Sequence, residues 1–209
     1  MKLRLPPVYP ITDKRLACST SHLSILRELV RGGATLVQIR DKSTPLGDLL
    51  PDLRKCAEFA RERGVVLIVN DRCDLALCCG ADGVHLGQDD LPPSAARPLL
   101  GRGRIIGFST HNSRQVKAAA LGQADYLGFG PVFDTATKAS RWPATGIEGL
   151  RRACAAVPRP VVAIGGIGPG RIREVLGAGA ASAAVVSAVM SGGRIAWRME
   201  ALLAEAKGR

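Results

Sequence analysis

Short apolar runs rich in β-branched residues alternate along the chain with longer stretches in which apolar residues recur at helical spacing, and Gly, Pro, Asn or Asp stands at nearly every junction. The pattern predicts repeated strand–helix units. We expect strands at residues 8–12, 35–39, 65–69, 83–86, 104–108, 126–128, 161–164 and 183–186. We expect helices at residues 21–31, 48–63, 73–79, 93–100, 113–121, 147–156, 170–176 and 194–206.

Strands that alternate with helices favour a parallel sheet with right-handed crossovers, and eight such units suggest that the sheet closes. We therefore predict an α/β protein with a single (β/α)8 TIM-barrel domain over residues 1–209, since no linker or low-complexity segment interrupts the repeat. An open doubly wound sheet is the alternative. Its usual GxGxxG turn after the first strand is missing, because residues 9–13 read YPITD.

The composition, 46% hydrophobic and 22% charged, is typical of a soluble globular protein and argues against a disordered or fibrous one. No apolar run approaches a membrane span, and Pro6 and Pro7 stand where a signal peptide would need its apolar stretch, so we expect a cytoplasmic protein. The six cysteines form no CxxC pair, which weakens zinc and disulfide interpretations, and we expect mostly buried, inert thiols.

The 29 Lys and Arg residues exceed the 18 Asp and Glu residues, giving a net charge of +11 that suits either a nucleic acid or a small anionic substrate. The basic residues are scattered, and only 4% of the chain is aromatic, so platforms for base stacking are few. A basic nucleic-acid-binding barrel is therefore the weaker alternative to an enzyme.

In a barrel of this kind the chemistry gathers at the carboxyl ends of the strands. The second predicted strand runs into Gln38, Arg40 and Lys42, which strict alternation would point to the same side. Three inward polar groups would be costly without a ligand, which makes them candidates for substrate binding. The alternative is a frayed strand end with solvated charges.

Aspartates follow the third and fourth predicted strands, at Asp71 and at Asp89 or Asp90. Neighbouring carboxylates could bind Mg²⁺, which commonly takes one or two of them together with water and substrate phosphates. Both positions also precede predicted helices, so capping of those helices is an equally good explanation for each aspartate alone.

The fifth predicted strand leads to Ser109 and His111. His111 could act as an acid or base, although a histidine near a loop more often makes a hydrogen bond or faces solvent. His85, inside the fourth strand, is expected to be a core residue with satisfied hydrogen bonds. No Ser/His/Asp order is recognisable.

The longest non-periodic stretch follows the sixth strand, where Thr135, Thr137 and Lys138 could clamp a phosphate or form a plain polar loop. After the seventh strand, Gly165 and Gly166 open a helix, and residues 186–187 read VS after the eighth. The loops after these two strands bind phosphate in many barrels, and their glycine turns offer backbone N–H donors.

Taken in order, the motifs closely resemble those of the thiamine phosphate synthase family over residues 9–188. The segments that carry the resemblance are QIRDK at 38–42, VND at 69–71, GADGVHLGQDDLP at 80–92, STH at 109–111, GPVF at 130–133 with TATK at 135–138, and AIGGI at 163–167. The resemblance implies a barrel enzyme that joins 4-amino-2-methyl-5-(diphosphooxymethyl)pyrimidine to a thiazole phosphate, or to its carboxylated tautomer. The products are thiamine phosphate and diphosphate, formed through a dissociative reaction that needs no nucleophile from the protein.

Carried over residue by residue, the resemblance implies the following roles. The pyrimidine diphosphate is bound by Gln38, Arg40, Lys42, Asn70, Ser109 and Lys138, of which Arg40, Lys42, Ser109 and Lys138 take the catalytic roles. Asp71 and Asp90 bind the cofactor Mg²⁺, and Thr135, Thr137, Gly166, Val186 and Ser187 lie on the thiazole phosphate side.

A related barrel family, the thiazole tautomerases, uses a histidine in the loop after the fifth strand, where His111 stands, and is the alternative function. Those relatives generally lack the paired aspartates and the Thr-x-Thr-Lys loop that this sequence retains. The resemblance also suggests a homo-oligomer acting on small molecules, without nucleic-acid or membrane partners.

Overall fold

The computed structural model describes residues 4–135 and 142–208, and within these ranges eight strands alternate with nine helices. The strands are β1 (Val8–Pro10), β2 (Leu36–Ile39), β3 (Val66–Asn70), β4 (Gly83–Leu86), β5 (Ile105–Thr110), β6 (Tyr126–Phe129), β7 (Val161–Ala163) and β8 (Ser182–Val185). The helices are α1 (His22–Arg31), α2 (Leu46–Glu62), α3 (Cys73–Cys79), α4 (Pro93–Leu100), α5 (Ser113–Ala120), α6 (Gly146–Ala155), α7 (Ile172–Gly177), α8 (Ser187–Met190) and α9 (Ile195–Ala206).

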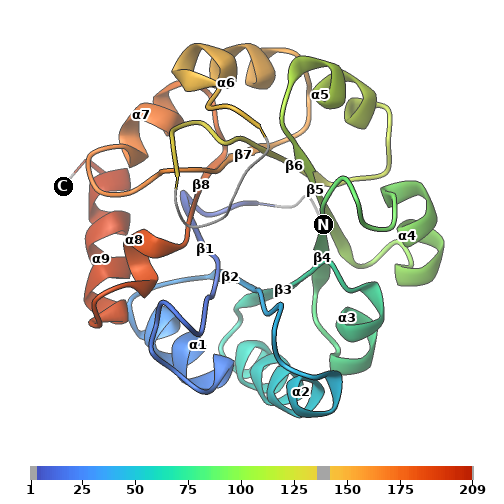
Figure 1. Cartoon of the computed structure of the whole chain (residues 1–209), viewed down its shortest axis with the longest axis vertical. Coiled ribbons are helices and arrows are strands. Elements are labelled where there is room, and N and C mark those ends of the chain that lie inside the picture. Colours follow the sequence, from blue (N-terminus) through green and yellow to red (C-terminus); the bar gives the residue numbers. More distant parts are fainter. Residues whose placement is uncertain (1–3, 136–141, 209) are drawn as a thin grey trace.

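The strands form a parallel sheet in the order β1-β8-β7-β6-β5-β4-β3-β2. Its two outer strands meet, because Ile11 forms a parallel bridge with Gln38 and the Thr12 N–H donates to the Gln38 carbonyl at 2.9 Å. Figure 1 shows the resulting ring of strands with the helices around it. The predicted barrel is therefore confirmed, and the open doubly wound alternative is wrong.

Most predicted elements lie within two residues of the observed ones. The first strand is shorter than predicted, since it ends at Pro10 and Ile11 takes part only in the bridge that closes the barrel. The fifth is longer and runs to Thr110. The helix α8 was not predicted, because its four residues directly follow a run of apolar strand residues and span too little chain to show a helical period.

Two apolar layers stabilise the barrel. The larger lies between the sheet and the helices and includes Leu26, Leu53 and Leu67. The smaller fills the inside of the ring, where Tyr9 and Tyr126 are joined by Ile11, Leu36, Ile68, Val162 and Ala184. Successive residues of each strand alternate between the two layers, as the pleat of a strand requires.

The thiol prediction is right for Cys56, Cys73 and Cys79, which are buried, and wrong for Cys18 and Cys78, which are exposed. Cys154 is half-buried, and burial raises its pKa to about 11. In the part of the chain that the structure describes, no helix has the length and apolar character to cross a bilayer.

Candidate functional site

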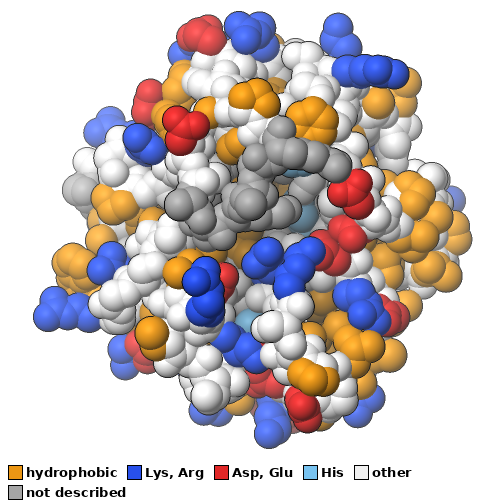
Figure 2. All heavy atoms as spheres, in the orientation of Figure 1, with side chains coloured by type: hydrophobic (Ala, Val, Ile, Leu, Met, Phe, Trp, Pro, Cys, Tyr) orange, Lys and Arg blue, Asp and Glu red, His pale blue; other side chains and the backbone are white. Residues whose placement is uncertain are grey.

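The carboxyl ends of β2, β3 and β4 bring opposite charges together. In Figure 2, blue Lys and Arg side chains lie beside red Asp and Glu side chains near the middle of the face shown, over these strands. The Lys42 Nζ atom lies 2.7 Å from Asp71 Oδ2, and Asp90 from the next loop lies within hydrogen-bonding reach of Asp71. The predicted juxtaposition of the two aspartates is therefore present.

The two carboxyl groups differ in proton affinity. Burial raises the pKa of Asp90, and the neighbouring Asp71 charge raises it further against the opposing hydrogen bond from the Gly87 N–H. Burial also acts on Asp71, but the Lys42 ammonium and the contact with Asp90 lower its pKa overall. The two neighbouring carboxylates therefore repel each other, an arrangement that a divalent cation would relieve.

Neither aspartate caps a helix, which removes the alternative explanation. The residue before α3 is Arg72 and the residue before α4 is Pro92, and neither makes a side-chain capping bond. The Asp90 Oδ2 atom instead accepts the Gly87 N–H at 2.6 Å within its own loop. Asp71 has a φ of +65°, a left-handed conformation that is uncommon for a residue with a side chain and that often marks functional sites.

The three polar residues expected to face inward at the end of β2 do not share one environment. Gln38 is buried inside the ring, with 2% of its surface exposed. The side chains of Arg40 and Lys42 are 26% and 55% exposed, because β2 ends at Ile39 and strict alternation ends with it. Only Gln38 is therefore an inward strand residue, while the two cations stand at the mouth of the barrel.

Arg40 and Asn70 stand at the carboxyl ends of β2 and β3. The Arg40 guanidinium lies 3.9 Å from Asp13 Oδ2, and its backbone N–H donates to Thr12 Oγ1 at 3.1 Å. Asn70 is the half-buried last residue of β3, directly before Asp71. Both residues are thus placed at the same mouth as the candidate metal ligands.

Ser109 lies on β5 beside a histidine that is satisfied as predicted. His85 Nε2 lies 2.9 Å from Ser109 Oγ, and His85 Nδ1 lies 2.9 Å from the Tyr126 hydroxyl. Gln38 Nε2 donates to the Tyr9 hydroxyl at 2.9 Å. The two tyrosines were not among the predicted site residues, although their positions in strands that line the inside of a ring are a usable signal.

The loops after β6 and β7 pack tightly against each other through two glycines. Gly165 and Gly166 have φ angles of +100° and +63°, and a Cβ atom at Gly166 would lie 2.5 Å from the Asp134 carbonyl oxygen. The Arg171 guanidinium donates to the Gly166 carbonyl at 2.7 Å and stacks over the Phe133 ring at 4.3 Å. Only glycine fits this turn.

The remaining residues assigned to the thiazole phosphate are distributed as follows. Val186 immediately precedes α8 and Ser187 is its first residue, at the carboxyl end of β8. Thr135 is half-buried at the end of the segment that packs on Gly166. Thr137 and Lys138 lie outside the described residues.

A buried network beneath the β2 loop was not predicted. Asp41 Oδ2 lies 2.9 Å from Lys14 Nζ and 3.0 Å from His22 Nε2, while Asp41 Oδ1 accepts the backbone N–H groups of Ser43 and Thr44. Burial opposes ionisation, but the hydrogen bonds from Lys14 and Thr44 dominate and hold the pKa of Asp41 far below its usual range. The network ties the segment that carries Arg40 and Lys42 to β1 and α1.

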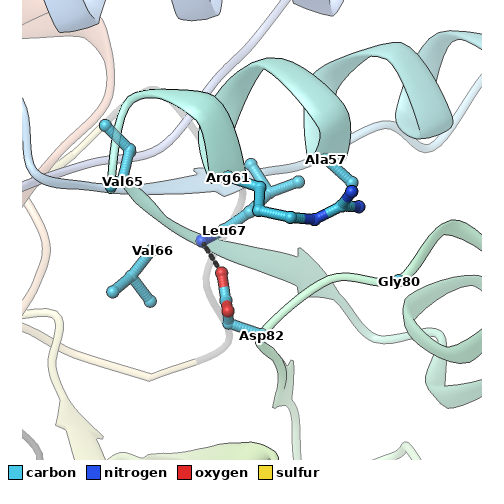
Figure 3. A pocket seen from close by; sticks show the side chains of 8 residues that line it. Ala57, Arg61, Val65, Val66, Leu67, Gly80 and Asp82 are labelled. Atoms are coloured by element: carbon cyan, nitrogen blue, oxygen red, sulfur yellow. Dashed lines mark hydrogen bonds between the residues drawn. The ribbon is translucent and has the colours of Figure 1, made fainter.

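A hollow at the other end of the barrel from the paired aspartates has fewer charged side chains (Figure 3). It lies at the amino ends of β3 and β4, where Asp82 accepts the Leu67 N–H at 2.8 Å and Arg61 forms part of the wall. Its other lining residues are Ala57, Gly64, Val65, Val66 and Gly80. The carboxyl-end mouth therefore holds the candidate site, as expected for a barrel of this class.

Within residues 4–135 and 142–208, no group of three or more His, Cys, Asp or Glu side chains is arranged to hold a metal ion. A site built from Asp71 and Asp90 would consequently depend on oxygen atoms from water and substrate for its remaining ligands. That donor set suits Mg²⁺, which binds few protein carboxylates and keeps several waters.

A family model described as thiamine monophosphate synthase matches residues 8–189 of the chain. The chain belongs to this family. A thiamine-phosphate synthase from Chloroflexus aurantiacus is 42% identical over 88% of this chain and 85% of its own length. One from Methanoregula boonei is 45% identical over the same shares of the two chains. The solved thiamine phosphate pyrophosphorylase from Pyrococcus furiosus is 37% identical, covers 96% of this chain and 95% of its own, and superposes with a TM-score of 0.88.

Membership in the thiamine monophosphate synthase family makes the chain a transferase of thiamine biosynthesis. The resemblance inferred from the motifs is thereby confirmed. The relationship favours the enzyme, which acts on small molecules, over a nucleic-acid-binding barrel.

Within this synthase family member, His111 occupies the position that the tautomerase alternative would use. Its Nδ1 atom lies 2.6 Å from the Gly130 carbonyl oxygen, and its ring stacks on Trp142 with 5.2 Å between ring centroids. A carbonyl only accepts hydrogen bonds, so Nδ1 carries a proton and the ring orientation is set. These contacts explain the conformation of His111 without requiring a catalytic role.

Proposed function

We propose that the protein condenses 4-amino-2-methyl-5-(diphosphooxymethyl)pyrimidine with a thiazole phosphate, or with its carboxylated tautomer, in a Mg²⁺-dependent reaction. The products are thiamine phosphate and diphosphate. The observation that carries the proposal is the contact of Asp71 with both Lys42 and Asp90 at the mouth that Arg40 also lines. Paired carboxylates next to cations suit a diphosphate bound through a divalent metal.

Asp71 and Asp90 would hold the metal. The fit rests on two observations. One carboxyl group reaches the other, and the pKa of Asp90 is raised by burial and by the neighbouring Asp71 charge, although the Lys42 ammonium opposes this rise. When bound, Mg²⁺ would neutralise charge that develops on the departing diphosphate.

Lys42 and Arg40 would bind the diphosphate directly. Both are partly exposed at the mouth and lie close to carboxylates, Lys42 at 2.7 Å from Asp71 and Arg40 at 3.9 Å from Asp13. Phosphate oxygens can replace these contacts with charge-assisted hydrogen bonds. By resemblance, Lys138 would add a further cation from the loop after β6.

The proposed chemistry is dissociative. The bond between the pyrimidine methylene carbon and the diphosphate oxygen breaks with its electron pair leaving on oxygen, and the resulting pyrimidinylmethyl cation is captured by the lone pair of the thiazole nitrogen. Gln38, Asn70 and Ser109 would orient the pyrimidine, and cations preorganised around the leaving group would supply most of the rate enhancement. The protein contributes no nucleophile.

The thiazole phosphate would bind where the loops after β6, β7 and β8 meet, at Thr135, Thr137, Gly166, Val186 and Ser187. Gly166→Ala is expected to raise the KM for the thiazole phosphate roughly tenfold, because the new Cβ atom must displace the Asp134 carbonyl that lies 2.5 Å away. The KM for the pyrimidine diphosphate should change little, which steady-state kinetics with each substrate varied in turn would measure.

Gly170→Ala is the matched control for this prediction. Gly170 also has a left-handed φ, of +84°, but a Cβ atom there would meet nothing within 4 Å. The control variant bears similar backbone strain without the collision, so equal kinetic effects of the two substitutions would remove Gly166 from the thiazole phosphate site.

The proposed reaction is tested by mixing the purified protein with the pyrimidine diphosphate, a thiazole phosphate and Mg²⁺, and following thiamine phosphate and diphosphate with and without a chelator. We expect equal amounts of both products, formed only when the metal is present. Product formation at full rate in excess chelator would refute the metal role. Interconversion of carboxythiazole tautomers without condensation would assign the tautomerase function and make His111 the residue to substitute.

A further inference from the structure

Four hydrogen bonds form a continuous chain through the inside of the barrel. Gln38 Nε2 donates to the Tyr9 hydroxyl at 2.9 Å, and that hydroxyl lies 2.7 Å from the hydroxyl of Tyr126. Tyr126 lies 2.9 Å from His85 Nδ1, and His85 Nε2 lies 2.9 Å from Ser109 Oγ. The chain, here called the barrel relay, thus connects two residues of the proposed pyrimidine site through three residues that have no assigned role.

The barrel relay is built into space that a glycine leaves open. His85, Gly107 and Tyr126 stand side by side on β4, β5 and β6 in strand register. A Cβ atom at Gly107 would lie 2.4 Å from His85 Nδ1 and 2.4 Å from the Tyr126 hydroxyl. The hydrogen bond between these side chains therefore passes directly over the glycine and could not coexist with any larger residue.

Each phenol in the relay has one proton to donate. Tyr9 and Tyr126 are 1% and 0% exposed, and burial raises the pKa of both, so both hydroxyls stay protonated. Because the Gln38 amide nitrogen can only donate, Tyr9 accepts from it and gives its own proton to Tyr126. Tyr126 then donates to His85 Nδ1, which leaves the imidazole proton on Nε2, facing Ser109.

The two other proton arrangements have different consequences. If the Gln38 amide were turned over, every bond would reverse and His85 would carry its proton on Nδ1. If the imidazole carried both protons, Tyr126 would donate to Tyr9, and the Tyr9 proton would lack an acceptor within the relay. The protonation pattern of His85 therefore reports the direction of all four hydrogen bonds.

We propose that Tyr9, Tyr126 and His85 are positioning residues that fix the polarity of the pyrimidine site. The relay turns the Gln38 amide oxygen and the Ser109 hydroxyl proton toward the ligand, so the site accepts a hydrogen bond at one end and donates one at the other. An aminopyrimidine, with its exocyclic amine and ring nitrogens, matches this pattern, whereas the 4-oxo analogue reverses it. The inference rests on the proposed function for the identity of the ligand.

The direction of the relay is tested first without substrate. Nitrogen-15 NMR of the full-length protein labelled at histidine distinguishes the two neutral tautomers, and a His85→Gln variant assigns the His85 signals. We expect a proton on Nε2 of His85, in contrast to His111, whose Nδ1 donates to Gly130 and serves as an internal reference. A proton on Nδ1 of His85, or on both nitrogens, would overturn the proposal whether or not the protein makes thiamine phosphate.

The effect on recognition is tested in Tyr126→Phe, which removes the central hydroxyl and keeps the ring. We expect the ratio of kcat/KM for the aminopyrimidine diphosphate to that for its 4-oxo analogue to fall roughly tenfold, since Gln38 and Ser109 can then rotate independently. The His85 signals should also lose their single-tautomer pattern. An unchanged ratio with unchanged signals would show that the tyrosine only fills space.

Two further variants complete the design. Tyr9→Phe interrupts the same relay at the neighbouring hydrogen bond. The Tyr9→Phe/Tyr126→Phe double variant should therefore lose no more discrimination between the two pyrimidines than either single variant, and additive losses would contradict a single connected unit.

Ser182→Ala is the matched control, because its hydroxyl is buried on β8 and has no hydrogen-bond partner among the described residues. If wild-type protein condensed neither pyrimidine, the proposed function would fail while the NMR result would still decide the relay.

Discussion

Replacing Asp90 by asparagine is expected to lower kcat by about two to three orders of magnitude. Asparagine has the same shape and retains an oxygen that can accept the Gly87 N–H, so the loop after β4 should keep its conformation. What is lost is the negative charge beside Asp71, and with it the second carboxylate available to a divalent metal. A bound Mg²⁺ would contribute several kcal/mol to the departure of diphosphate, and weaker metal binding in the variant would forfeit much of this contribution, which corresponds to the expected loss of rate.

The adjacent residue provides the control for Asp90. Asp89 is an exposed carboxylate on the same loop, and Asp89→Asn removes the same charge from nearly the same position in the chain. Turnover should be measured for both variants over a series of Mg²⁺ concentrations. We expect the Asp90 variant alone to need far more metal; wild-type turnover and wild-type metal dependence in that variant would exclude Asp90 as a ligand.

The barrel could be predicted from the sequence because each strand–helix unit has a recognisable local pattern. Apolar runs, helical periodicity and glycine junctions are all readable over about ten to twenty residues. Strand order likewise predicted Asp71 close to Asp89 or Asp90, since these residues follow neighbouring strands of a parallel sheet, and the family resemblance selected Asp90. It could not choose between a metal site and two helix caps, because that choice depends on which atoms the carboxylates face.

The hydrogen bonds of the barrel relay could not be predicted from local sequence patterns, because they join residues that are far apart in the chain. Tyr9 and Tyr126 are 117 residues apart, and they meet because two strands that are not neighbours in the sheet, β1 and β6, each direct a long side chain into the ring. The environment of Arg40 and Lys42 was misjudged because alternation was extended past Ile39, where β2 ends. Local periodicity identifies an element but does not say which residue is the last to obey it.

The Asp41 network allows the largest stability effect to be predicted. Replacing Asp41 by alanine is expected to lower the free energy of unfolding by about 3–5 kcal/mol at neutral pH. The carboxylate side chain is 2% exposed and lies 2.9 Å from Lys14 Nζ and 3.0 Å from His22 Nε2. Its removal would leave these donors and two backbone N–H groups of the loop without their acceptor.

Urea unfolding of wild type and variant at several pH values would measure the loss and its cause. Because the folded-state pKa of Asp41 is lowered, its contribution is complete above the unfolded-state value of about 3.9 and declines as the pH falls below it. The two unfolding curves should therefore converge in acid. Asp74→Ala, which breaks an exposed pair with Arg72, should cost less than about 1 kcal/mol at any of these pH values.

The Asp41→Ala variant also distinguishes the contribution of the Asp41 network to stability from its contribution to substrate binding. Asp41 stands between Arg40 and Lys42, and its bonds to Lys14 and His22 are what fasten their loop to β1 and α1. At a temperature where the variant is still folded, we expect a raised KM for the pyrimidine diphosphate and an unchanged KM for the thiazole phosphate. An equal rise in the KM values for both substrates would mean that Asp41 supports the barrel as a whole. Arg40 and Lys42 would then reach their positions without it.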